Sequence, residues 1–361
     1  MRSLLSSLPS RIEKEIALER DDRFSTPPKG RPVGRSILSW PLGLSLAFLL
    51  LVATARAWGG EPIKVLCIGN SFAQNATSYL GDFSREGEKP IEYLVAFKPG
   101  CSLQEHAEGL AVAEKNPESA AARIYSNKGF DKSGVQTTFN LIEALKRKKW
   151  DIVTIQQFSV LCYKSETYEP YAGQVIAAIR QYAPQAEIVV LQTWAYREDD
   201  SLFSKGDFTY QKMHELLQAA YAKLAADYHL RTIPIGNAFH TARALPRWTF
   251  IPDATFDFAH PAEGALPNEK GGLHKGWVWK KDEKTSEMKL KRDGHHANSD
   301  GQYLGAAVFF EFLIGTNVEA LSFHPPDLAP EDAAMLRKIA HETIVAQKQV
   351  EATPALVKGG G

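Results

Sequence analysis

Two short motifs near opposite ends of the sequence carry residue types that acyl transfer needs. The first is Gly69-Asn70-Ser71-Phe72, which follows an apolar run and places a hydroxyl where a strand is expected to turn into a helix. At such a turn, backbone N–H groups at the helix N-terminus can stabilise a developing oxyanion. Ser and Asn are also common N-caps, so this motif alone is compatible with a structural role for Asn70 or Ser71.

The second motif is Asp293-Gly294-His295-His296-Ala297-Asn298. An Asp three residues before a His, on a loop or incipient helical turn, can reach the imidazole Nδ1 and leave Nε2 free to take a proton from a hydroxyl. The two motifs together predict Ser71 as a nucleophile, His296 as its base and Asp293 as the acid that orients the base. By itself, the second motif also fits a solvated surface loop with a helix cap.

The neighbouring His295 raises a metal-dependent hydrolase centred on Asp293, His295 and His296 as an alternative. We predict no metal, because the sequence has no HExxH, CxxC or carboxylate cluster nearby to complete a coordination shell. A serine acyl transfer needs no cofactor, so none is expected.

Asn70 and four further residues are candidates for binding the oxyanion or the substrate. Gly100 follows the second expected strand and would let a backbone N–H approach a substrate closely, although it also suits an ordinary turn. Gln156 and Gln157 stand where the third apolar run ends, and one amide can serve as an oxyanion donor. Adjacent strand residues point to opposite faces, so only one of the two can serve. His106 is a candidate substrate contact, with a solvated loop histidine as the alternative.

Alternating apolar strands and amphipathic helices would position these residues. The pattern predicts an α/β fold, a three-layer α/β/α sandwich around a central five-stranded parallel sheet. In such a sheet the ligand crevice lies beyond the carboxyl ends of the strands, where the motifs above fall. The expected strands are 63–68, 91–97, 152–156, 188–192 and 232–235, and the expected helices are 72–85, 135–146, 168–182, 208–228, 301–313 and 330–347.

The chain divides into a leader, one large domain and a short tail. Residues 1–57 read as a signal peptide, because an apolar run ends in Ala55-Arg56-Ala57, with small residues where a signal peptidase prefers them. Export to the periplasm or the extracellular space is therefore expected, or anchoring through 36–55 if the segment is retained. The domain is expected at 58–350 and a disordered tail at 351–361.

Two insertions interrupt the domain, at about 105–133 and 248–292. The first predicts a short helix and a loop over the strand ends. The second contains Trp277-Val278-Trp279, which alternates with polar residues as a short hairpin does. These tryptophans can line the site or serve as packing anchors.

Charge and cysteine content restrict the partners. Lys plus Arg equals Asp plus Glu at 42 each, which argues against a nucleic-acid partner and favours a neutral or small substrate. A membrane partner follows only if the apolar segment is retained. Cys67, Cys101 and Cys162 are too few for a disulfide scaffold; Cys67 reads as a buried hydrophobe, while a bridge between Cys101 and Cys162 stays open.

In chain order, these motifs resemble those of the SGNH hydrolase superfamily, the GDSL-like lipases and esterases. The matching residues are Ser71, Gly100, Gln156 or Gln157, and Asp293 with His296. The sequence looks like a poorly characterised branch, with Gly-Asn-Ser-Phe in the first block and Gln-Gln where Gly-x-Asn-Asp is usual. The resemblance implies a flavodoxin-like fold and a serine esterase, in the first place a carbohydrate O-acetyl esterase or another small-ester esterase. A non-catalytic carbohydrate-binding protein on the same fold is a further alternative.

Overall fold

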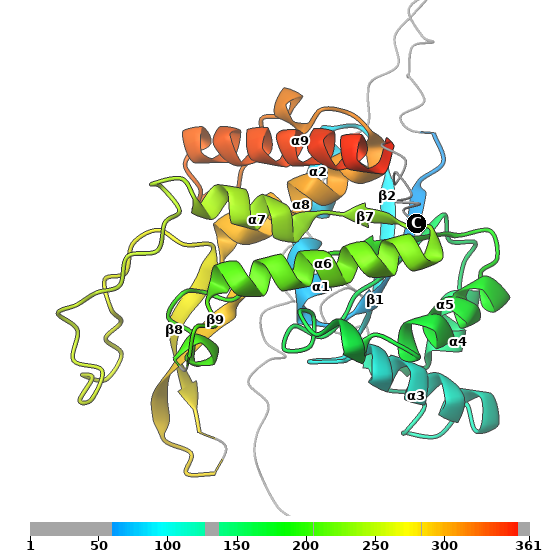
Figure 1. Cartoon of the computed structure of the whole chain (residues 1–361), viewed down its shortest axis with the longest axis horizontal. Coiled ribbons are helices and arrows are strands. Elements are labelled where there is room, and N and C mark those ends of the chain that lie inside the picture. Colours follow the sequence, from blue (N-terminus) through cyan, green and yellow to red (C-terminus); the bar gives the residue numbers. More distant parts are fainter. Residues whose placement is uncertain (1–59, 127–136, 205, 283, 353–361) are drawn as a thin grey trace, which may run out of the picture. The chain divides into compact units, whose positions relative to one another are not determined.

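A parallel sheet forms the centre of the fold (Figure 1). The computed structural model describes residues 60–126, 137–204, 206–282 and 284–352. The strands of the sheet lie in the order β4-β3-β2-β1-β5-β6-β7. The five parallel strands are β1 (Ile63–Gly69), β2 (Ile91–Phe97), β5 (Ile152–Ile155), β6 (Glu187–Leu191) and β7 (Arg231–Ile233).

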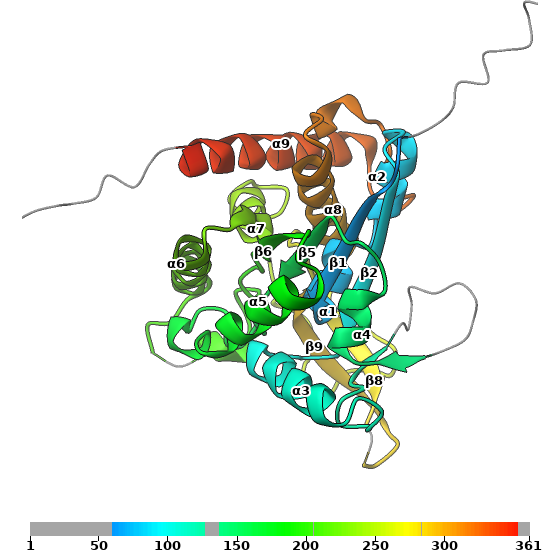
Figure 2. The ribbon, with the colours of Figure 1, turned by 90° about the vertical axis from the view of Figure 1, so that its right-hand side faces the viewer.

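The parallel strands are buried because helices cover both faces of the sheet. The last five residues of β1 and all of β5 are buried, as their continuous apolar sequences predict for strands of this kind. In Figure 2, α3, α4 and α5 lie on one side of these strands, and α2, α8 and α9 lie on the other. The predicted α/β class and layered arrangement are confirmed.

The helices follow the strands along the chain. They are α1 (Ser71–Ala76), α2 (Leu80–Glu86), α3 (Leu103–Lys115), α4 (Leu141–Lys146), α5 (Tyr171–Tyr182), α6 (Tyr210–Tyr228), α7 (Ile235–Arg243), α8 (Ser299–Ile314) and α9 (Pro330–Ala352). The described residues also form three short 3₁₀ turns, η1 (Ser165–Thr167), η2 (Ser201–Phe203) and η3 (Val318–Ala320).

The structure differs from the sequence prediction in several local features. The single helix expected at 72–85 is two short helices, and Thr77 at the break turns its hydroxyl back onto the carbonyl of Ala73. Helix α4 begins only at Leu141, because Asn140 and Glu143 form a capping box. Helix α7 was not predicted. Two short antiparallel strands, β3 (Tyr125–Ser126) and β4 (Thr138–Phe139), extend the parallel sheet beside β2.

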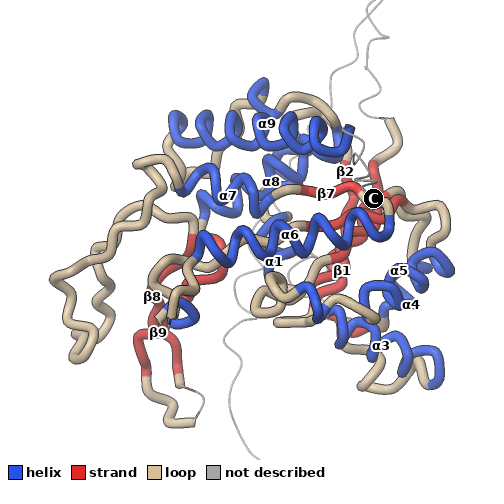
Figure 3. The backbone as a smooth tube through the Cα atoms, in the orientation of Figure 1, coloured by secondary structure: helices blue, strands red, loops and turns tan. Residues whose placement is uncertain are grey.

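The second insertion forms a separate two-stranded sheet. Strands β8 (His274–Lys281) and β9 (Met288–Ala297) pair antiparallel, and the hairpin is much longer than the one expected at 277–279 (Figure 3). Strand β9 ends directly before α8, so the Asp-Gly-His-His motif lies at the base of the hairpin instead of in a loop.

The structure tests only some of the expectations about the leader, the tail and the cysteines. The leader at 1–57 lies outside them, as does almost all of the tail at 351–361. No helix within the described ranges is both long enough and apolar enough to cross a membrane. All three cysteines are buried and free, so Cys101 and Cys162 form no bridge.

Candidate active site

Ser71 stands at the turn between β1 and α1. Asn70 is the N-cap of α1: its Oδ1 accepts the backbone N–H of Phe72 at 3.0 Å. The Asn70 amide also donates to the carbonyl of Cys101 at 3.0 Å, which joins this turn to the one after β2. Ser71 is the first residue of α1, and its hydroxyl is partly exposed. Because Asn70 caps the helix, the Ser71 side chain remains available for another partner.

The base of the hairpin brings an imidazole to this hydroxyl. His296 Nε2 lies 2.7 Å from Ser71 Oγ, although the two residues are 225 positions apart. The opposite ring nitrogen, Nδ1, lies 2.9 Å and 3.0 Å from the two carboxylate oxygens of Asp293. Asp293 also accepts the backbone N–H of His296 at 3.2 Å. The carboxylate side of the ring requires a proton on Nδ1, which leaves Nε2 as an acceptor for the serine proton.

Contacts on either side of His296 hold it in place. The N–H of Ala297 donates to Asn75 Oδ1 of α1 at 3.0 Å. The indole N–H of Trp194 donates to the carbonyl of His295 at 2.9 Å, and the Trp194 ring stacks on Phe72 of α1. The last residues of β9 are thus fixed against α1 and against the segment that follows β6.

The charge of Asp293 is held by its neighbours. Burial of this carboxyl acts to raise its pKa, but the hydrogen bond from His296 and the charges of both adjacent imidazoles outweigh burial and leave the pKa well below its usual value. Burial, followed by the charge of His296, lowers the pKa of His295. Asp293 is therefore an anion near neutral pH, and it lies against the imidazole that becomes cationic when His296 takes a proton.

The predicted oxyanion donors differ in whether an N–H group remains available for a substrate. Gly100 has a left-handed φ of +63°, a conformation suited to glycine. Gln157 is fully committed: its carbonyl accepts the N–H groups of Leu103 and Phe158, and its amide donates to the carbonyl and hydroxyl of Thr167. Gln156 donates one amide N–H to Asn70 Oδ1 at 2.9 Å. Gln156 is thus the member of the pair that keeps a second N–H.

Comparison with known proteins identifies the family. A family model described as "Domain of unknown function (DUF4886)" matches residues 64–245, which is just over half of the chain. The chain belongs to the DUF4886 family. A crystal structure of a DUF4886 family protein from Bacteroides uniformis ATCC 8492 shares its fold, with 24% identity, a TM-score of 0.59, and coverage of 79% of this chain and 95% of that one.

Two further solved structures overlap less closely. A candidate SGNH hydrolase from Slackia heliotrinireducens is 20% identical, covers 70% of this chain and 99% of its own, and has a TM-score of 0.41. A candidate GDSL-like lipase from Parabacteroides merdae ATCC 43184 is 13% identical, with 69% and 94% coverage and a TM-score of 0.37. No curated protein matches the chain. The expected layered α/β fold is shared with the Bacteroides uniformis structure, and the family description agrees with the expectation of a poorly characterised branch.

His106 is not at the site of this DUF4886 protein, contrary to one sequence interpretation. It lies on α3 with no exposed surface; its Nδ1 is 2.7 Å from the hydroxyl of Tyr125, and its ring stacks on the Tyr125 ring. Its Nε2 is buried without a hydrogen-bond partner among the described residues. Burial lowers the pKa of His106 to about 3, so the ring is neutral in the folded protein. His106 is a core residue because α3 turns it into the protein from a segment whose sequence reads as polar.

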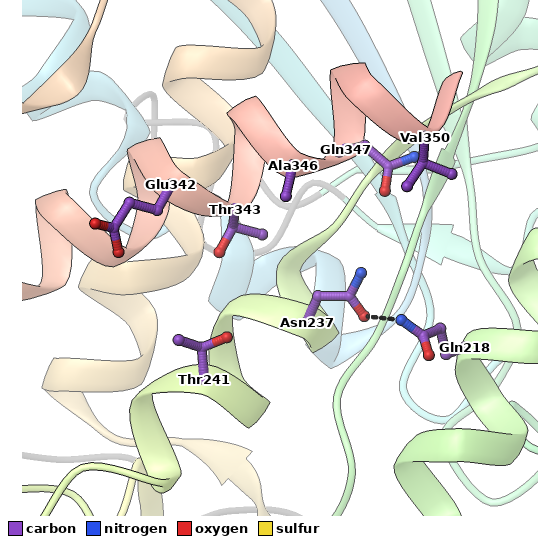
Figure 4. A pocket seen from close by; sticks show the side chains of 8 residues that line it. All are labelled: Gln218, Asn237, Thr241, Glu342, Thr343, Ala346, Gln347 and Val350. Atoms are coloured by element: carbon purple, nitrogen blue, oxygen red, sulfur yellow. Dashed lines mark hydrogen bonds between the residues drawn. The ribbon is translucent and has the colours of Figure 1, made fainter. Parts of the chain in front are cut away.

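Two pockets of the described region lie away from Ser71. One, with a volume of about 280 Å³, lies between α6, α7 and α9, where Asn237 accepts a hydrogen bond from Gln218 (Figure 4). Another, of about 420 Å³, lies between α3, α4 and the end of α5. Neither is lined by Ser71, Asp293 or His296. The three residues instead sit at a rim, where Ser71 and His296 are partly exposed and Asp293 is buried.

The buried state of His106 predicts a measurable pH dependence of stability. Its pKa is lowered in the folded protein, so the unfolded chain alone binds this proton as the pH falls from about 6.5 to about 3. Unfolding free energy should therefore decrease toward acid, with His106 contributing roughly 1.4 kcal/mol per pH unit in that window. His106→Asn, which keeps a partner for Tyr125, should reduce the slope by that amount in urea unfolding between about pH 4 and 6. The exposed-site variant His260→Asn should keep the wild-type slope, and equal slopes for all three proteins would contradict the assignment.

Proposed function

We propose that this protein is a serine hydrolase that cleaves a carboxylic ester by acyl transfer through Ser71. The observation that carries the proposal is the unbroken hydrogen-bonded series from Ser71 Oγ to His296 Nε2 (2.7 Å) and from His296 Nδ1 to Asp293 (2.9 Å). Ser71 Oγ attacks the ester carbonyl carbon while His296 Nε2 takes its proton. The same proton then passes to the leaving alcohol, and water repeats the sequence to release the acid.

Asp293 has two tasks in this mechanism. Its hydrogen bond to Nδ1 fixes the tautomer in which Nε2 is an acceptor, and its negative charge stabilises the imidazolium that forms during attack. The lowered pKa of Asp293 supports the second task, since a neutral carboxyl would give no such stabilisation. Its hydrogen bond to the His296 backbone also fixes the distance between acid and base.

The tetrahedral oxyanion needs donors on the far side of the carbonyl from His296. The proposed donors are the backbone N–H groups of Ser71 and Gly100, together with the second amide N–H of Gln156. Support comes from the hydrogen bonds that connect these three positions: Asn70 bonds to Cys101 next to Gly100, and Gln156 bonds to Asn70 next to Ser71. Preorganised donors of this kind need no rearrangement as charge develops.

The proposed substrate class is a small ester, in the first place an O-acetyl group on a carbohydrate. This part rests on the expected export of the chain and on the aromatic side chains of the second insertion, such as Trp277, which pairs with Arg292 across the hairpin and contacts Phe258. The partly exposed rim around Ser71 suits an acyl group carried by a larger soluble molecule. Export and substrate identity are independent of the triad and are tested separately.

A second candidate is a metal-dependent hydrolase, favoured by the proximity of Asp293, His295 and His296, whose ligand atoms lie within 4.8 Å of one another. Such an enzyme would lose activity in a chelator and keep it after Ser71→Ala. A non-catalytic carbohydrate-binding protein would hydrolyse no ester.

Replacing the nucleophile tests the proposal directly. Ser71→Ala should reduce hydrolysis of 4-nitrophenyl acetate by at least about 10³-fold and abolish labelling by a fluorophosphonate probe, since the attacking oxygen is gone. Ser78→Ala is the matched control, because Ser78 is an exposed serine just beyond the same short helix. It should retain activity and labelling. Unchanged hydrolysis by Ser71→Ala would refute the serine mechanism.

Replacing the acid tests how the base is held. Asp293→Asn should lower kcat by up to about 10⁴-fold near neutral pH, because an amide can favour the tautomer in which Nε2 carries the proton. Asp282→Asn, at the tip of the same hairpin, should leave kcat unchanged.

Gln156 and Gln157 should separate into a donor and a structural residue. Gln156→Leu removes the spare N–H and should lower kcat by about 10²- to 10³-fold with a smaller change in KM. Gln157→Leu leaves buried groups unpaired and should chiefly lower the melting temperature. Thermal unfolding and steady-state kinetics on both variants distinguish the two roles. If Gln156→Leu changed only the melting temperature, the oxyanion donors would be confined to the backbone.

A further inference from the structure

His295 stands beside the triad without a part in the mechanism above. Its ring centroid is 4.2 Å from that of His296 and 5.4 Å from that of Tyr196. Neither ring nitrogen makes a hydrogen bond with another described residue; Nδ1 lies 3.5 Å from Asp293 Oδ1. The side chain is 36% exposed, so solutes can reach it.

The three side chains Asp293, His295 and His296 have the spacing of a transition-metal site. One ligand atom from each lies within 4.8 Å of the other two. The separations from Asp293 Oδ1 are 2.9 Å to His296 Nδ1 and 3.5 Å to His295 Nδ1. Ligand atoms bound tetrahedrally to zinc at about 2.0 to 2.1 Å are about 3.3 Å apart, so both separations are close to the value required. Two imidazoles and a carboxylate are ligands that Zn²⁺ accepts.

We propose that Asp293, His295 and His296 form an inhibitory site for Zn²⁺, in which metal binding and ester hydrolysis exclude each other. The inhibitory effect rests on the proposed function, because it concerns the same imidazole. The metal site itself rests on the geometry of the three side chains.

The exclusion follows from the tautomer of His296. For catalysis, Nδ1 carries the proton that Asp293 accepts, and Nε2 has the free lone pair that takes the proton of Ser71. When Nδ1 donates its lone pair to Zn²⁺, the ring proton must reside on Nε2, and solvent can carry it from one nitrogen to the other without net proton release. Nε2 is then a donor and can no longer accept the proton of Ser71. The metal also takes the carboxylate that would stabilise the imidazolium.

One positive charge already faces this site. Lys280 Nζ lies 3.7 Å from Asp293 Oδ2, and the side chain is more than half exposed, so the ammonium can move aside when a cation binds. Its charge should nevertheless weaken the attraction for Zn²⁺. Removing it therefore offers a change in the opposite direction from removing a ligand.

The test combines inhibition with direct binding. In hydrolysis of 4-nitrophenyl acetate, ZnCl₂ should inhibit the wild type at micromolar concentrations, excess EDTA should restore the rate, and MgCl₂ should have no effect. His295→Asn should raise the half-inhibitory zinc concentration at least about tenfold while kcat/KM without zinc stays within about twofold. Lys280→Met should lower the half-inhibitory concentration. His260→Asn is the matched control, because His260 also lies near an aspartate three residues away, Asp257, on an exposed loop; it should behave as wild type.

Calorimetric titration of zinc into the Ser71→Ala protein separates the two proposals. One zinc ion per chain should bind, and the added His295→Asn change should weaken binding at least about tenfold. An active wild type that zinc leaves uninhibited, or a His295→Asn variant inhibited and titrated like wild type, overturns the inhibitory site. Absence of ester hydrolysis and of Ser71 labelling would refute the proposed function, while the calorimetry would still decide whether the three side chains hold zinc. Activation by zinc with loss of activity in EDTA would refute inhibition and favour the metal-dependent hydrolase.

Discussion

The site depends on one docking contact, that of the end of β9 on α1. Ser71 and His296 are 225 positions apart, so chain connectivity does nothing to bring them within hydrogen-bonding distance. The hydrogen bond from the Ala297 N–H to Asn75 Oδ1 fixes the residue after His296 to the helix that begins with Ser71. A buried hydrogen bond of this kind is costly to break, because each group would lose a partner away from water. Because this hydrogen bond lies one residue from His296, it also holds the imidazole in place.

Aromatic packing makes the docking rigid. Trp194 follows β6, stacks between Phe72 and Phe239, and donates its indole N–H to the carbonyl of His295. The Trp194 side chain therefore contacts α1, α7 and the base of the hairpin at once, and joins them to the segment that follows β6. At the hairpin base, Gly276 pairs with Asp293 at a φ of +76°, and a β-carbon there would lie 2.8 Å from the guanidinium of Arg197. Glycine is needed at this position because the buried ion pair of Arg197 with Glu269 occupies the space that a side chain would take.

Much of this could be predicted from sequence because the information is local. Continuous apolar runs identified the five parallel strands. Asp293 and His296 are only three residues apart, so their contact could be expected from their spacing alone. Features that depend on tertiary packing could not be predicted from the sequence. His106 lies in a segment whose composition reads as solvated, yet the face of α3 on which it falls is turned toward Tyr125. The separate fates of Gln156 and Gln157 follow from partners at Asn70 and Thr167 that no local pattern indicates. The strands β3 and β4 are too short to leave a periodic signal.

The first motif shows how a structural and a chemical reading of the same residues can both hold. Asn70 and Ser71 are each good helix caps, and a single hydroxyl cannot both cap a helix and lie free for attack. The structure gives the cap to Asn70, whose Oδ1 accepts from Phe72 and from Gln156 and whose amide reaches the turn of Gly100. A helix begun by its preceding residue has no further use for the serine side chain, so Ser71 Oγ can point to His296. Asparagine at this position has a physical meaning: an amide can donate to the carbonyl of Cys101 as well as accept from Phe72, which a carboxylate cannot do. Asn70 thereby connects the turns that follow β1 and β2, and the surface on which the chemistry is proposed becomes one hydrogen-bonded unit.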